Sequence, residues 1–250
     1  MTIDLDFNTS KTTRSLVSQS FAELVDTALE SSVETPRDYL GASLIGDPCS
    51  RKIQYEFTHA PKRPHEAKLR RIFARGHALE PYIARWLRKA GFDLQDTSLK
   101  TGMPFGFSVA QDRLRGHVDG IILAGPKNVG LSYPCIWECK VVNAKGWRNV
   151  ERHGVAKAYP KYADQVAVYQ TYMEDMQRPA LMTFANADTM EVFYEIVPFD
   201  AARAQAATDK AVNILIATDA GETLPRIAAS RDDFPCKWCE FVDHCWSAPR

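Results

Sequence analysis

The sequence predicts a mixed α/β fold in which helices flank one central sheet. The chain has 250 residues, and 45% of them are hydrophobic, which is enough for the core of one sizeable domain. Segments with apolar residues at helical spacing alternate with short segments typical of strands, and the strands come in two pairs. No internal repeat is visible, which argues against repeat architectures. This order of elements indicates a layered α/β core.

The first half of the chain contains two predicted helices and one predicted strand. Residues 15–29 predict a helix because apolar residues such as Leu16 and Phe21 recur near helical spacing. Residues 78–90 predict a second helix, whose apolar stripe ends at Gly91. Residues 114–123 then predict a strand.

The second half alternates strands and helices. A loop punctuated by Gly125 and Pro126 leads into the next strand, and Asn186 and Asp188 mark the turn of the last strand pair. The predicted elements are a strand at 135–142, a helix at 162–176, strands at 182–184 and 191–197, and an Ala-rich helix at 201–218.

Charge and hydropathy narrow the class of protein. The 31 Lys and Arg residues balance 31 Asp and Glu residues, so a nucleic-acid site would need local clustering of charge. No apolar run approaches the roughly 18 residues of a membrane helix, and the N-terminus does not resemble a signal peptide. We therefore expect a cytoplasmic protein whose six cysteines serve metal or redox chemistry more than disulfides.

One segment, from Lys62 to Arg75, is strongly basic. It is compatible both with a solvated helix face and with a surface that contacts a phosphate backbone. The candidate DNA-binding residues are Lys62, Arg63, Lys68, Arg70, Arg71 and Arg75, together with Arg51 upstream.

Two carboxylates and a lysine can converge if the strands at 114–123 and 135–142 pair. Side chains alternate across a strand, so Glu138 and Lys140 share a face, and Asp119 lies at the centre of the preceding predicted strand. Two carboxylates supply the hard oxygen ligands that Mg²⁺ or Mn²⁺ prefers. A protonated lysine beside them can stabilise charge on a phosphate or help to activate water. Cys135 and Cys139 point to the opposite face, where we expect them to be small buried hydrophobes.

Two further features strengthen this pattern. Glu80 stands at a predicted helix start and can bring a third carboxylate, although an acid there can also serve only the helix dipole. Gln165 and Tyr169 are four residues apart and share one helix face, which is also common for ordinary packed residues.

In combination these motifs resemble the PD-(D/E)XK nuclease superfamily, in the branch of RecB-type and Cas4-type exonucleases. The aspartate motif falls on Asp119, the E-x-K motif on Glu138 and Lys140, and the Q-x-x-x-Y motif on Gln165 and Tyr169. Many Cas4-type members carry a histidine where this chain has Glu80, which is more similar to the lambda-exonuclease and YqaJ-like branch. The resemblance spans residues 41–245. It implies a restriction-endonuclease-like core with a central mixed sheet flanked by helices.

The C-terminal tail is dense in cysteine. Cys236, Cys239 and Cys245 form a C-x2-C-x5-C pattern, and Cys49 is the one cysteine left to join them. Four thiolates fit either tetrahedral Zn²⁺ or an iron–sulfur cluster, and His244 is an alternative ligand that we expect instead to be exposed. Cas4-type and AddB-type nucleases are similar in this layout, and the resemblance implies a [4Fe–4S] cluster. The implied organisation is an N-terminal extension with a helix (1–40), a nuclease core (41–231) and an iron–sulfur tail (232–250) that closes onto Cys49.

The resemblance implies a Mg²⁺- or Mn²⁺-dependent DNA exonuclease in a bacterial or phage-infected cell. The implied metal ligands are Glu80, Asp119, Glu138 and the backbone carbonyl of Cys139. Lys140 would orient or activate water, while Gln165 and Tyr169 support the site. DNA ends are the expected substrate, and a homo-oligomer or a recombination or CRISPR-adaptation partner is compatible with the family. The alternatives are a non-cleaving DNA-binding or recombination accessory, and a zinc-stabilised interaction protein.

Overall fold

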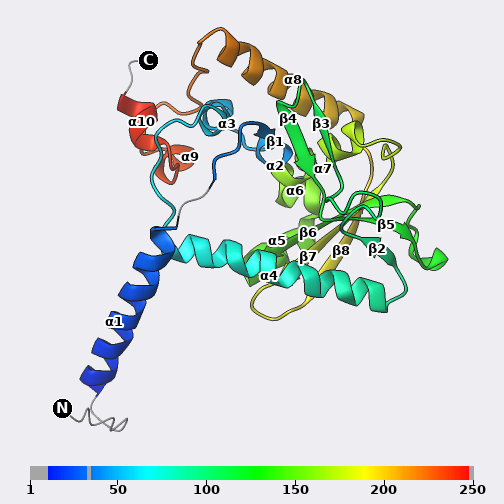
Figure 1. Ribbon diagram of the computed structural model, residues 1–250, viewed down its shortest axis with the longest axis horizontal. Coiled ribbons are helices and arrows are strands. Elements are labelled where there is room, and N and C mark those ends of the chain that lie inside the picture. Colours follow the sequence, from blue (N-terminus) through cyan, green and yellow to red (C-terminus); the bar gives the residue numbers. More distant parts are fainter. Residues whose placement is uncertain (1–10, 33–34, 248–250) are drawn as a thin grey trace.

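The protein is a mixed α/β structure with two mixed sheets flanked by helices (Figure 1). This computed structural model describes residues 11–32 and 35–247, with side chains from residue 15 onward. The first ten residues of the predicted N-terminal extension therefore lie outside the described part of the chain. The expectation of helices around a mixed sheet is confirmed, but the expectation of one sheet is wrong, because the strands divide between two.

The larger sheet has five strands and carries most of the core. Its order is β2 (Asp93–Gln95), β5 (Gly120–Ala124), β6 (Cys135–Val142), β7 (Ala180–Asn186) and β8 (Val192–Val197). β6 and β7 run parallel, and the other pairs are antiparallel. Every residue of β7 is buried, as expected for a strand covered on both faces.

The smaller sheet explains why the predicted strand at 114–123 is interrupted. β4 (Leu114–His117) lies between β1 (Leu40–Gly41) and β3 (Gly106–Val109), whereas β5 pairs in the other sheet. The chain changes sheets across Val118 and Asp119, which belong to neither strand. Asp119 is therefore a half-buried residue at the break between two strands, rather than lying within a strand as predicted.

Helix α4 (Ala67–Lys89) covers one face of the larger sheet, where Ile83, Ala84 and Leu87 pack with Trp137. The predicted helix at 78–90 is only its second half, because Pro81 lies inside the helix without ending it. Glu80 consequently stands far from the helix start. The interpretation of Glu80 as an acid that serves the N-terminal helix dipole is thus wrong.

The opposite face packs against α7 (Pro160–Tyr172), and α8 (Ala201–Asp219) packs in turn on α7. These helices correspond to the predicted helices at 162–176 and 201–218, although α7 ends at Tyr172. Four shorter elements, α2 (Ala42–Ile45), α3 (Ser50–Phe57), α5 (Ala144–His153) and α6 (Val155–Ala158), complete this side, and a 3-10 turn, η1, spans Lys127–Val129.

The helices nearest the two ends of the described chain are placed differently relative to the core (Figure 1). Helix α1 (Lys11–Glu30), predicted over 15–29, projects from the body and is tied to α4 by an ion pair between Asp26 and Arg71 (Figure 1). The tail forms α9 (Phe234–Lys237) and α10 (Val242–Ser247) next to α3. No helix in the described part of the chain has the length and apolar character to span a bilayer.

Candidate functional site

Strand β6 places Glu138 and Lys140 on one face, as its alternation predicts. The Lys140 ammonium donates to Glu138 Oε1 at 2.5 Å. Glu138 is only 1% exposed, and the Lys140 side chain is 18% exposed. Such a buried pair is costly to form, because both charges lose water. An energetically unfavourable ion pair at this position indicates a candidate functional site.

Helix α7 brings two more polar side chains to the same point. The Gln165 amide nitrogen donates to Glu138 Oε1 at 2.9 Å and to the Tyr169 hydroxyl at 2.8 Å. Gln165 and Tyr169 are both buried. Glu138, Lys140, Gln165 and Tyr169 therefore form one connected network, which we call the Glu138 network.

Tyr162 is a neighbour of this network that the sequence analysis did not single out. The Lys140 ammonium lies 5.2 Å from the centre of the Tyr162 ring, within the range of a cation–π contact. Tyr162 precedes Gln165 by three residues on α7, so helical spacing alone would have placed both on one face.

Asp119 reaches the network from the break between β4 and β5. Its Oδ2 accepts the backbone N–H of Cys139 at 2.7 Å. The Asp119 carboxylate thereby lies beside the backbone of β6 next to Glu138.

Glu138 and Glu80 hold their protons more tightly than ordinary glutamates do. Burial, followed by the nearby charge of Asp119, raises the pKa of Glu138 to about 8, and Lys140 only partly opposes this. Burial and Asp119 also raise the pKa of Glu80 to about 7. Burial acts to lower the pKa of Lys140, but Glu138 and Asp119 outweigh burial and raise it. The acids thus outnumber the cations here, which is the electrostatic setting that a bound cation would relieve.

Glu138 also has an unused acceptor that a cation would satisfy. Its Oε2 is buried and has no hydrogen-bond partner in the structure. A buried oxygen without a partner is unfavourable unless some other group binds it. The donor set of carboxylates fits Mg²⁺ or Mn²⁺.

The three predicted carboxylate ligands are not gathered around a single point. In the described part of the chain, no three His, Cys, Asp or Glu side chains are placed to hold one metal ion together. Glu80 comes from α4, which packs on the Cys139 face of β6, whereas Glu138 lies on the other face. The described structure thus does not by itself gather these three carboxylates at one metal position, although Glu80 and Asp119 interact electrostatically, and their role as metal ligands stays a prediction.

The two cysteines on the other face of β6 are core residues, as predicted. Cys135 is fully buried and Cys139 nearly so, and both pack beneath α4. Burial raises the pKa of the Cys135 thiol to about 12, so this thiol stays protonated and inert at neutral pH.

The basic segment before and within α4 is partly neutralised by acids. Lys62 pairs with Glu56 at 2.8 Å, Arg63 binds both oxygens of Asp243, and Arg71 pairs with Asp26. Arg70 donates to Ser32 at 2.7 Å. Lys68 is exposed, and Arg75 is half-buried with its Nε lacking a partner. These contacts favour the interpretation of the segment as a structural and solvated face over that of a phosphate-binding surface.

Arg51 requires a correction. It is only 7% exposed, and its guanidinium donates to the carbonyl of Leu224 and to Cys245 Sγ, the latter at 3.7 Å. Because the guanidinium is buried and bonded to these partners, it is not available to contact DNA as predicted. Its position at the cysteines has no signature in the sequence, because Leu224 and Cys245 are distant along the chain.

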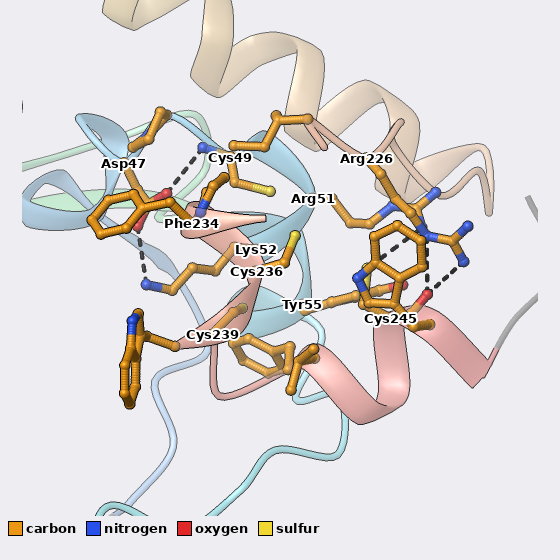
Figure 2. A pocket seen from close by; sticks show the side chains of 17 residues that line it. Asp47, Cys49, Arg51, Lys52, Tyr55, Arg226, Phe234, Cys236, Cys239 and Cys245 are labelled. Atoms are coloured by element: carbon orange, nitrogen blue, oxygen red, sulfur yellow. Dashed lines mark hydrogen bonds and ion pairs between the residues drawn. The ribbon is translucent and has the colours of Figure 1, made fainter. Parts of the chain in front are cut away.

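The four cysteines Cys49, Cys236, Cys239 and Cys245 line one cavity of about 250 Å³ (Figure 2). Cys49 caps α3, Cys236 lies on α9, Cys239 follows it, and Cys245 lies on α10. The tail thus meets the segment that precedes the core, as the predicted layout requires. His244 is half-buried rather than exposed, because its ring packs edge-on against Tyr55 at 4.9 Å.

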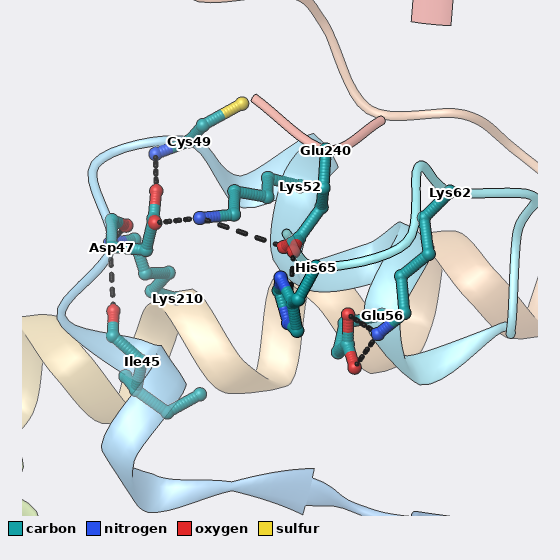
Figure 3. Close-up of polar contacts among 9 residues, drawn as sticks. All are labelled: Ile45, Asp47, Cys49, Lys52, Glu56, Lys62, His65, Lys210 and Glu240. Atoms are coloured by element: carbon teal, nitrogen blue, oxygen red, sulfur yellow. Dashed lines mark hydrogen bonds and ion pairs between the residues drawn. The ribbon is translucent and has the colours of Figure 1, made fainter. Parts of the chain in front are cut away.

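A polar network holds the Cys49 side of this cavity (Figure 3). Asp47 accepts the backbone N–H of Cys49 at 2.9 Å and pairs with Lys52 at 3.0 Å. Lys210, from α8, donates to the carbonyls of Asp47 and Ile45 at 2.7 and 2.9 Å. The loop that carries Cys49 is therefore anchored to both α3 and α8.

The thiols in the cavity influence one another. Burial raises the pKa of Cys49, and the neighbouring charges of Asp47, Cys245 and Cys236 add to that effect. Burial also raises the pKa of Cys239, and the negative charge of the Cys49 thiolate adds to this rise. Four cysteine sulfurs around one cavity are a donor set that fits a metal centre. Lys52, Tyr55 and Arg226, which also line the cavity, were not foreseen from the sequence.

Neither a protein-family model nor a curated protein matches this sequence. Among solved structures, the fold is similar to the crystal structure of SSO0001, with a TM-score of 0.48 and 15% identity over 94% of this chain and 96% of that chain. It is also similar to LHK-Exo, an alkaline exonuclease from Laribacter hongkongensis, with a TM-score of 0.49 and 16% identity over 80% of this chain and 93% of that chain. The structure of LHK-Exo in complex with dAMP is similar with a TM-score of 0.49 and 15% identity, over 80% of this chain and 93% of that chain. Because these TM-scores lie below 0.5, the function proposed below depends on the site residues alone.

Proposed function

We propose that this protein is a DNA exonuclease of the Cas4/RecB type that hydrolyses phosphodiester bonds with Mg²⁺ or Mn²⁺. The observation that carries the proposal is the Glu138 network, in which a buried glutamate has one oxygen in hydrogen bonds and the other without a partner. A structural ion pair would satisfy both oxygens, whereas a cation-binding glutamate keeps one available.

Each residue of the site has a distinct task. Glu138 and Asp119 would hold the cation, and the Cys139 carbonyl and Glu80 are the further candidate ligands. The Cys139 N–H donates to Asp119, and the charge of Asp119 acts on Glu80. When bound, the metal activates water and offsets negative charge on the phosphate. Gln165 fixes the rotamer of Glu138, and Tyr169 fixes Gln165.

Lys140 acts as a charged group rather than as a free base. Glu138 and Asp119 raise its pKa, so the amine stays protonated at neutral pH. Its ammonium is then available to a phosphate oxygen and to the water that attacks the phosphorus. Tyr162 limits where the ammonium can move, because its ring lies 5.2 Å away.

The test is digestion of end-labelled single- and double-stranded DNA in Mn²⁺ by wild type and Lys140→Ala. We expect Lys140→Ala to lose about 10²-fold or more in rate, as removal of a positioned catalytic group does. Lys100→Ala removes an exposed loop lysine and serves as the control, with wild-type rate expected. Full activity of Lys140→Ala would remove Lys140 from the mechanism.

We further propose that Cys49, Cys236, Cys239 and Cys245 hold a [4Fe–4S] cluster with a structural role. Its support is the shared cavity, together with Arg51 beside Cys245 and Lys52 near Cys239, which offset the charge of thiolates. A cluster binds each thiolate through a different iron, so the thiolates stand further apart than around one zinc ion.

The cluster is tested by assaying iron, sulfide and zinc in an anaerobic preparation. We expect iron with equimolar sulfide, both lost in Cys236→Ser, and little zinc. Zinc without iron would contradict the cluster and favour a zinc-stabilised interaction protein.

A non-cleaving DNA-binding accessory is the second candidate. One observation favours it, namely that no three described acidic or thiol side chains converge on one metal position. DNA binding without any cleavage in Mg²⁺ or Mn²⁺ would select this function.

A further inference from the structure

Helix α5 (Ala144–His153) presents a basic face to solvent. Trp147 and Val150 are buried on its inner side, whereas Lys145, Arg148 and Arg152 are exposed at helical spacing on the outer side. This face borders an open concavity of about 530 Å³ with no acidic residue in its lining. The lining consists of Asn143, Lys145, Gly146, Arg148, Asn149, Arg152 and His153.

The charges on this face are not balanced by carboxylates. Among the described residues, Lys145, Arg148 and Arg152 have no ion pair, in contrast to Lys62, Arg63 and Arg71. Three acids lie nearby but do not cover the face, and one of them, Glu195, accepts the backbone N–H of Val155 just beyond the end of α5. Glu151 is exposed on the adjacent flank of α5, and Asp188 accepts the N–H of Ala144 at 2.8 Å. Because the whole chain has no net charge, three uncompensated cations on one face are a local excess.

The position of α5 connects this face to the Glu138 network. β6 carries Lys140 and ends at Val142, and α5 begins two residues later. The Trp147 indole donates to the carbonyl of Phe184 on β7 at 3.2 Å, and Asn143 accepts the N–H of Gly146 at 2.8 Å. The helix is therefore held firmly against the sheet next to the end of β6, as Figure 1 also shows.

We propose that the outer face of α5 binds the phosphates of a DNA strand whose neighbouring phosphodiester lies at the Glu138 network. The proposal rests on the proposed nuclease function for its choice of ligand. Lys145, Arg148 and Arg152 contact successive phosphates, while Asn143 and Asn149 offer neutral hydrogen-bond donors. The lining holds no Phe, Tyr or Trp and three cations, a composition suited to binding the phosphate backbone.

The test measures binding of fluorescein-labelled DNA by anisotropy over a series of salt concentrations, in Ca²⁺ without Mg²⁺ or Mn²⁺. The variant is Lys145→Gln/Arg148→Gln/Arg152→Gln, in the full chain. The matched control is Lys62→Gln/Arg63→Gln/Arg71→Gln, which removes three cations already paired with acids. Circular dichroism and metal content verify that both variants fold.

We expect the α5 variant to bind about tenfold or more weakly, with a slope of log affinity against log salt that is shallower by about 2. The control should keep most of the wild-type slope. An unchanged slope in the α5 variant, an equal loss in the control, or a wild type that binds no DNA would overturn the proposal.

A cleavage assay in Mn²⁺ separates this proposal from the proposed function. If the wild type binds through α5 but does not cleave, the nuclease function fails and the DNA surface stands. If the wild type cleaves and the α5 variant binds as the wild type does, the nuclease function stands and the DNA surface fails.

Discussion

At the scale of single residues, Glu138 is the side chain to which the other groups of the site are connected. It is buried, bonded through Oε1 to Lys140 and Gln165, and free of partners at Oε2. Burial and Asp119 raise its pKa to about 8, far above its ordinary value of 4.5. The protein therefore tolerates an unfavourable carboxylate at this position, as functional sites commonly do.

The raised pKa of Glu138 predicts a pH dependence of stability. In the folded metal-free protein, burial and Asp119 raise the pKa of Glu138 above its ordinary value of 4.5, although the ion pair with Lys140 opposes the rise. As pH rises through that value the folded state binds more protons than the unfolded chain, so the free energy of unfolding falls. In Glu138→Gln the free energy of unfolding should fall less steeply with pH. A smaller fall should remain, because the pKa of Glu80 is also raised. Urea unfolding in EDTA at pH 5.5 and 8 measures both proteins. Identical pH slopes in wild type and variant would contradict the assignment.

The cysteines of β6 predict a contrast in reactivity. Burial raises the pKa of Cys135 to about 12, and Cys139 is also buried beneath α4. After removal of metal, iodoacetamide at pH 8 should label Cys236 within minutes to hours and leave Cys135 and Cys139 unmodified in the folded protein. Peptide mass spectrometry reads the result. Labelling of Cys135 at the rate of Cys236 would show that its burial is wrong.

At the scale of elements, the site depends on how closely β4 approaches α7. A Cβ on Gly116 would lie 2.5 Å from the Tyr169 ring and 2.7 Å from the Phe107 ring. Only glycine lets the Tyr169 hydroxyl keep its hydrogen bond with Gln165 in this arrangement. The small sheet thereby supports the Glu138 network, although it contributes no member of it.

Gly116→Ala should consequently destabilise the protein by about 1–3 kcal/mol through overpacking. It should also lower cleavage, because Tyr169 and then Gln165 are displaced. Gly76→Ala is the matched control, since an added Cβ meets nothing within 4 Å in the middle of α4. The control should gain about 0.5–1 kcal/mol in urea unfolding. Equal effects of both substitutions would refute the close-approach argument.

At the scale of the whole molecule, the cysteine cavity ties the tail to α3 and α8. Lys210 anchors the Cys49 loop, Arg226 donates to the carbonyl of Cys245, and Arg63 pairs with Asp243. A cluster in this cavity would join the two ends of the core and restrict the unfolded chain.

Loss of the cluster should therefore release the tail before the core. Limited proteolysis of Cys236→Ser should cut within residues 220–250 at least about tenfold faster than wild type, while residues 40–219 persist. Lys237→Ala, at the next position, should behave as wild type. Uniform degradation of the variant would mean that the tail is not a separable clasp.

The local periodicities were predictable from the sequence, whereas the tertiary adjustments were not. The alternation on β6 and the four-residue spacing of Gln165 and Tyr169 follow from backbone geometry and meet in the Glu138 network. The break at Asp119 depends on β4 joining another sheet, which no local pattern records. The sequence predicts Arg51 to be a surface cation, whereas the structure buries it. Its partners, Leu224 and Cys245, are far along the chain, so no local pattern indicates that burial.

Cleavage of end-labelled DNA in Mn²⁺ by Glu138→Gln tests the central claim most directly. This variant keeps the shape of the side chain and removes the charge that binds the cation, so the account predicts loss of about 10²-fold or more in rate. Glu174 is an exposed glutamate outside the Glu138 network, and Glu174→Gln should cleave as wild type does. Wild-type cleavage by a folded Glu138→Gln protein would contradict the claim that the Glu138 network is the catalytic site.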